Sequence, residues 1–120
     1  MNLKRILALS AMCCGFAMAG HALAHAHPKS MVPAADAAVA SPAEVRIVFN
    51  EALETAFSSL TVQDAAGHAV AGGKTEVDSA THATMHMSLP ALVPGVYTVK
   101  WVAVARDGHR SSGSYRFTVK

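Results

Sequence analysis

The sequence predicts an all-β domain of antiparallel strands, a sandwich or a barrel. Short segments in which apolar and polar residues alternate recur along the chain, and turn residues such as Pro94-Gly95 separate them. No segment after residue 24 shows a long run of apolar residues at the helical spacing. With 120 residues, 52% of them hydrophobic and 15% charged, the chain holds one domain's worth of sequence and enough apolar surface to fold.

Residues 1–24 are predicted to be a cleaved secretory signal peptide. Lys4 and Arg5 form a basic start, residues 6–19 form an apolar stretch, and residues 22–24 have the small-x-small pattern of a cleavage site. A membrane anchor is the alternative, but the apolar stretch is shorter than the roughly 20 residues that a spanning helix needs. We therefore expect a secreted protein that begins, after processing, at the next residue.

The predicted mature domain, residues 25–120, differs in composition from the full chain. Removing 24 of the 120 residues leaves 96, and both cysteines, Cys13 and Cys14, leave with the signal peptide. A lipidated cysteine is a further alternative, but the large Met12 is a poor residue to precede one. Eight basic residues then balance eight acidic ones, so the formal charge of +2 falls to zero. The mature chain has no thiol chemistry, and its charge gives no reason to expect nucleic acid as a partner.

Alternation predicts both the strands and the core. The predicted strands cover residues 44–50, 60–62, 83–89, 96–105 and 114–119. Met85 and Met87 share one face of their strand, and Tyr97 and Trp101 share one face of theirs, so we expect all four side chains in the core. Residues 34–43 are expected to form a loop, with a helical turn at most.

Three features of the mature chain could bind a metal. Cleavage would make His25 the first residue, and an N-terminal histidine offers an α-amine and a ring Nδ1 that close one chelate ring. Asp107 and His109 flank Gly108 in a predicted turn, and residues two apart in an extended segment point to the same side. Glu51 follows the strand at 44–50 in an otherwise uncharged neighbourhood.

The chemistry of this donor set favours copper. Nitrogen and oxygen ligands in a flat arrangement suit Cu(II), whereas a structural zinc site would more often use thiolates, which the mature chain lacks. The alternative is that His25 belongs to a disordered polar end and that the turn at 107–109 is a solvated loop. The residue pattern alone leaves both interpretations open.

Four segments, taken in order, resemble one known family. They are His25-Ala26-His27-Pro28-Lys29-Ser30, then Val48-Phe49-Asn50-Glu51, then residues 94–101, and finally residues 105–117. Each is weak by itself, but together they make the whole mature chain resemble the CopC family of periplasmic copper-binding proteins. The resemblance implies a Greek-key β-barrel or sandwich of the Ig-like or cupredoxin-like kind, located in the periplasm.

The resemblance also implies a ligand set for one Cu(II) per chain. His25 would give its amine and its ring nitrogen, and Asp107 and His109 would complete the set. Glu51 matches an acidic residue that binds the metal in some members and lies behind the ligands in others. His27 matches a second N-terminal histidine of part of the family, and we expect it to belong to the N-terminal arm rather than to the ligands.

We expect no second site for Cu(I). Some family members have one in a methionine-rich loop, because thioethers select Cu(I). The mature chain has only Met31, Met85 and Met87, and the loop at residues 63–70 has no methionine. His82 and His86 are expected to be surface residues.

Two functions from different classes remain open. The first is a monomeric carrier, not an enzyme, that sequesters Cu(II) or passes it to an inner-membrane CopD-type transporter in copper homeostasis or resistance. The second is a copper enzyme, because an N-terminal histidine with a second histidine resembles the histidine brace of copper monooxygenases. The carrier is favoured, since Asp107 would fill a position that oxygen-activating copper keeps open.

Overall fold

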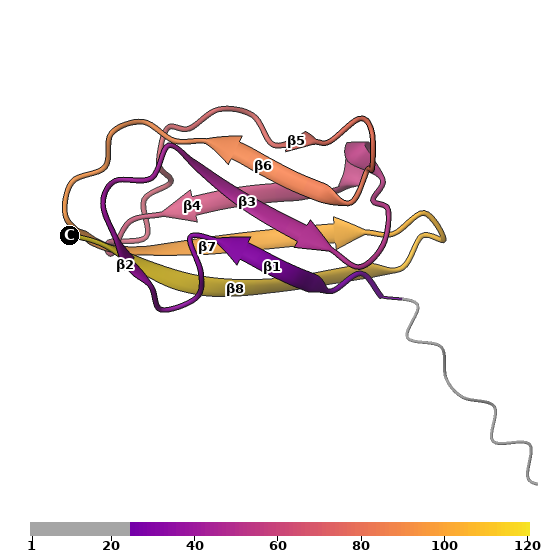
Figure 1. Cartoon of the computed structure of the whole chain (residues 1–120), viewed down its shortest axis with the longest axis horizontal. Coiled ribbons are helices and arrows are strands. Elements are labelled where there is room, and N and C mark those ends of the chain that lie inside the picture. The colour runs from indigo at the N-terminus through magenta and orange to yellow at the C-terminus, as the bar shows by residue number, and fades with distance from the viewer. Residues whose placement is uncertain (1–24) are drawn as a thin grey trace, which may run out of the picture.

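The computed structural model describes residues 25–120, which form two four-stranded sheets around one core (Figure 1). The predicted signal peptide, residues 1–24, lies outside the described residues. One sheet has the order β1-β3-β6-β5 and the other the order β2-β8-β7-β4. The elements are β1 (Pro28–Val32), β2 (Ala38–Val39), β3 (Glu44–Phe49), the 3-10 turn η2 (Thr55–Phe57), β4 (Ser59–Gln63), β5 (Glu76–Val77), β6 (Thr84–Ser88), β7 (Gly95–Val104) and β8 (Arg110–Val119). The predicted all-β fold class is confirmed.

Period-two alternation fills the core between the sheets. Every second residue of β3 is buried, and the same holds along β7 from Tyr97 onward. Met85 and Met87 of β6 are buried as well, at 0% and 5% exposed. The predictions that these methionines and the aromatic residues Tyr97 and Trp101 belong to the core are therefore confirmed.

The prediction of a loop over residues 34–43 is wrong at two residues. Ala38 and Val39 form β2, which runs parallel to the end of β8. Main-chain hydrogen bonds from Thr118 and Lys120 of the β8 end to the carbonyls of Ala37 and Val39 hold it there. A two-residue strand has no side-chain period, so alternation could not reveal it. The two-residue strand β5 was not predicted from the sequence for the same reason.

An aromatic contact joins the two sheets. The rings of Phe49 and Trp101 meet edge to face, with centroids 5.3 Å apart and planes at 71°. Trp101 pairs across the β7-β8 ladder with Gly113. A Cβ at residue 113 would stand 2.6 Å from the indole Cζ2, so the glycine makes room for the ring.

Three segments that are distant in sequence meet at one end of the sandwich. The start of β1, the end of β3 and the turn between β7 and β8 all lie at the right-hand end in Figure 1. The antiparallel pairing of β1 with β3 sets Pro28 opposite Phe49. The candidate ligands that the sequence singled out lie in or beside these segments.

Candidate metal centre

The turn between β7 and β8 presents Asp107 and His109 to solvent. Its main chain is closed by hydrogen bonds from Ala105 N to His109 O and from Gly108 N to Ala105 O, both 2.9 Å. Gly108 has φ +90°, a conformation that costs a glycine little and other residues more. The predicted turn at 107–109 is therefore confirmed, and both flanking side chains are exposed.

Asp107 and His109 are bonded to each other. Asp107 Oδ1 accepts the main-chain N–H of His109 at 3.0 Å, and its Oδ2 lies 2.9 Å from His109 Nδ1. The bond to the ring, and then the bond to the main chain, hold the pKa of Asp107 below its ordinary value. Because Nδ1 faces the carboxylate, Nε2 is the ring nitrogen of His109 that remains free to bind a metal.

The N-terminal arm, residues 25–27, is docked onto the sandwich. Ala26 is completely buried, and its carbonyl accepts a hydrogen bond from Ser111 Oγ at 2.6 Å. The N–H of His27 donates to Asn50 Oδ1 at 2.7 Å, and Asn50 N–H donates back to the carbonyl of His27 at 3.0 Å. The sequence analysis did not single out the side chains of Asn50 and Ser111 as contacts of the arm. The sequence around a single Asn or Ser does not indicate which distant residue it will bond.

This docking brings His25 to the turn. The imidazole rings of His25 and His109 lie 5.3 Å apart and meet at 70°, edge to face. The ring of His27 is farther from that of His25, at 6.4 Å. Three of the residues predicted as ligands, His25, Asp107 and His109, thus lie together in space.

Glu51 is half-buried just beyond β3, and no hydrogen bond or ion pair connects its carboxylate with His25, Asp107 or His109 in the described part of the chain. Residues 25–120 also hold no ready-made group of three or more His, Cys, Asp or Glu side chains around one point. The exposed side chains of the centre would have to rotate to converge on one ion.

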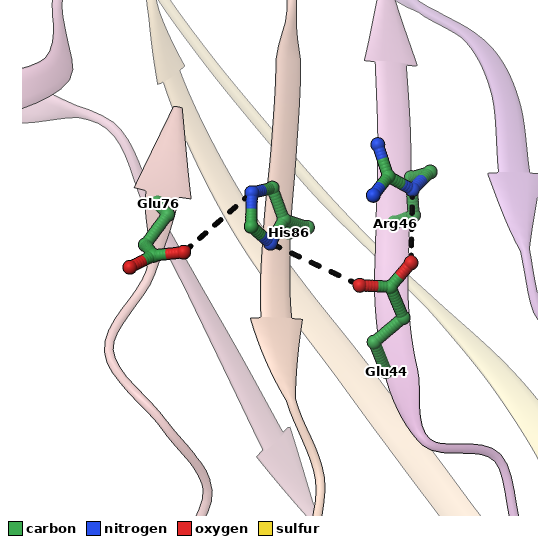
Figure 2. A network of polar contacts seen from close by, with 4 residues as sticks. All are labelled: Glu44, Arg46, Glu76 and His86. Atoms are coloured by element: carbon green, nitrogen blue, oxygen red, sulfur yellow. Dashed lines mark hydrogen bonds and ion pairs between the residues drawn. The ribbon is translucent and has the colours of Figure 1, made fainter. Parts of the chain in front are cut away.

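His86 belongs to a separate polar network on the first sheet. Its Nε2 lies 3.6 Å from Glu76 Oε2 and its Nδ1 3.9 Å from Glu44 Oε2, while Glu44 Oε1 accepts a hydrogen bond from Arg46 Nε at 2.9 Å (Figure 2). The two carboxylates face opposite ring nitrogens, so one ion could not bind the ring and both carboxylates. His86 and His82 are half-buried, so each keeps part of its surface in contact with solvent.

Within residues 25–120 no helix has the length and the apolar composition that crossing a membrane requires.

The family model described as "CopC domain" matches residues 28–120. Copper resistance protein C of Escherichia coli is 37% identical over 106 residues, covering 82% of this chain and 84% of that protein. Copper transport protein CutJ of Bacillus subtilis is 36% identical over 98 residues, which are 80% of this chain but only 18% of that longer protein. The crystal structure of CopC from Methylosinus trichosporium OB3b is similar with a TM-score of 0.75 and 31% identity, covering 80% of this chain and 94% of that one.

The matched region spans every strand of the sandwich, and the turn at 107–109 lies inside it. The relatives are similar over most of the described chain and share its fold. The names of the matched relatives and the match over the whole β domain agree with the resemblance drawn from the sequence. The chain belongs to the CopC family.

Proposed function

We propose that the processed protein is a periplasmic carrier that binds one Cu(II) ion through His25, Asp107 and His109. The observation that carries this proposal is the position of the His25 ring, 5.3 Å from the ring of His109, which Asp107 contacts. His25 and His109 are near opposite ends of the domain's sequence, and neither exposed side chain is needed to fill the core. Their donor atoms, two imidazoles and a carboxylate, suit Cu(II).

Removal of the signal peptide would complete the donor set. It would convert the main-chain nitrogen of His25 from an amide into an amine, whose proton a metal can displace near neutral pH. His109 would bind through Nε2. Asp107 would either leave the His109 ring to bind the ion or stay bonded to it and keep the ring oriented. Glu51, half-buried just beyond β3, would hydrogen-bond the amine or a bound water.

The proposed role of the bound copper is sequestration or delivery rather than catalysis. The relatives that match the chain bear the names of copper resistance and copper transport proteins. The matched region of CutJ, 18% of that protein, belongs to a protein named for copper transport, and this name supports delivery as the role. We propose a monomer in which Cu(II) is the cargo and no Cu(I) site is present.

A titration of the processed protein, residues 25–120, with Cu(II) tests this function. We expect one equivalent to bind, with nitrogen ligands visible by electron paramagnetic resonance. His25→Ala and His109→Ala should weaken binding by more than the roughly 10–100-fold that the loss of an outer partner of a ligand costs. Asp107→Asn should change the spectrum. His68→Ala, in the exposed loop before β5, is the matched control and should leave affinity unchanged.

Two outcomes would contradict the proposal. Unchanged affinity in both histidine variants would place the copper elsewhere. Sustained oxidation of a reductant by the copper-loaded protein, many turnovers per copper, would instead support the enzyme of the histidine-brace type.

A further inference from the structure

The peptide between His25 and β1 is clamped by both sheets. Asn50, just past β3, holds His27 through two hydrogen bonds, of 2.7 and 3.0 Å. Ser111, in β8 of the other sheet, holds the carbonyl of Ala26 at 2.6 Å. Between these two attachments the methyl group of Ala26 is completely buried in the core.

We propose that Asn50 and Ser111 are positioning residues of the copper site, which hold residue 25 beside His109 before copper arrives. This inference rests on the function proposed above and adds how its first ligand is placed. Neither side chain has to touch the metal. They act through the main chain of residues 26 and 27, which are one and two residues away from the residue whose amine processing would create.

Pre-organisation is the physical reason for expecting an effect on affinity. A free N-terminal arm samples many conformations, and binding through its first residue must order it, which weakens the observed affinity. An arm already held at Ala26 and His27 has lost that freedom in the metal-free protein. Because Ala26 is buried, the residue next to His25 is fixed in place. The main-chain nitrogen and the ring of His25 are therefore confined to the neighbourhood of the turn at 107–109.

Substitutions at Asn50 and Ser111 should loosen the arm without unfolding the domain. Asn50 is exposed and Ser111 is half-buried, and both contacts lie outside the β1-β3 ladder, whose register runs from Pro28 to Val32. The bond from the main chain of Asn50 to His27 survives any substitution there that keeps the N–H. Removal of one side chain should therefore loosen the arm only in part, and removal of both should free it.

The experiment compares processed wild type with Asn50→Ala, Ser111→Ala and the double variant. The double variant should bind Cu(II) about 10–100-fold more weakly, the range found when partners that orient a ligand are lost. At saturation its electron paramagnetic resonance spectrum should match that of the wild type, because the ligands are the same. In the metal-free state the amide of His27 should exchange its hydrogen faster, with the urea midpoint changed little.

Two controls keep the readout specific. Ser111→Thr retains a hydroxyl donor and should restore affinity to near the wild-type value. Ser112→Ala removes the neighbouring hydroxyl, which is exposed and bonds nothing in the arm, and should have no effect. If the double variant does not fold, the two single variants give the same comparison with smaller changes.

The outcomes separate this inference from the proposed function. If wild type and double variant bind with equal affinity, and both lose copper on His109→Ala, the positioning role is refuted while the function stands. An altered spectrum at saturation would also refute it, since the ligand set would have changed. If the wild type itself binds no Cu(II), the proposed function fails and the positioning role fails with it.

Discussion

Asp78 organises the turn that leads into β6. Its Oδ1 accepts the main-chain N–H of Ala80 at 2.7 Å and that of Thr81 at 3.1 Å. The bonds from Thr81 and then Ala80 favour the carboxylate and lower the pKa of Asp78 from its usual value. A folded-state pKa below the unfolded one gives stability that is present above the unfolded pKa and is lost as the pH falls through the folded one.

Replacing Asp78 should therefore have a pH-dependent cost. We expect Asp78→Ala to lower the thermal midpoint at about pH 7 by a few degrees and to lower it less as the pH falls toward about 2 and the wild-type carboxyl takes up its proton. Thermal unfolding followed by circular dichroism at both pH values measures the difference. Asp78→Asn, which keeps an Oδ1 acceptor but lacks the charge, should retain only part of this stability near neutral pH. An equal loss for Asp78→Ala at both pH values would speak against the ionised carboxylate as the cause.

At the scale of elements, the hairpin of β7 and β8 connects the core to the candidate centre. Its two strands run ten residues each and carry the turn with Asp107 and His109 at their far end. The Trp101 indole lies against Gly113 of the facing strand and packs on Phe49 of the other sheet. Trp101, the seventh of the ten residues of β7, thus anchors the hairpin to the first sheet, nearer the end that carries the turn.

A methyl group at residue 113 should disturb this anchor. The added Cβ of Gly113→Ala would stand 2.6 Å from Cζ2 and 2.8 Å from Cε2 of Trp101, so the ring or the strand must move. We expect a loss of about 1–3 kcal/mol in the free energy of unfolding, the usual cost of overpacking. Urea unfolding monitored by the fluorescence of the single tryptophan measures it. Ser112→Ala, on the outer face of the same strand, should change stability by less than about 0.5 kcal/mol, and a Gly113→Ala protein as stable as this control would show that the ring has room.

At the scale of the whole molecule, a metal held by His25 and His109 would join the two sheets. His25 leads into β1 of one sheet, and His109 immediately precedes β8 of the other. A ligand that binds only the folded chain stabilises it by mass action, by about 2.7 kcal/mol at a free concentration one hundred times the Kd. For a domain of this size each kcal/mol corresponds to roughly 4–8 °C.

Cu(II) should therefore raise the thermal midpoint of the processed protein by roughly 10–20 °C at that ratio. A variant with one glycine added before His25 has no α-amine on that residue, and we expect it to lose most of the shift while its metal-free midpoint stays the same. Calorimetry with and without Cu(II) on the two proteins tests this. An equal shift in both would mean that the amine of His25 takes no part in binding.

Much of the fold was predictable from local patterns. The alternation along residues 44–50 and 96–105 predicted β3 and β7 to within one residue. A strand with one buried and one exposed face alternates apolar and polar residues, and this period is visible in the sequence. The turn at 107–109 was predictable from Asp-Gly-His. The short strands β2 and β5 were not, since main-chain pairing with a neighbour, rather than any side-chain period, makes them strands.

The sequence by itself determined the all-β class, the core faces of the long strands and the identity of the candidate donor residues. Only the tertiary structure decided that His25 reaches His109 and that Asn50 and Ser111 hold the arm. The contacts that do so join residues 23 and 85 positions apart. No local period or turn rule links such distant positions, because their meeting depends on how the two sheets pack and on the burial of Ala26 between them.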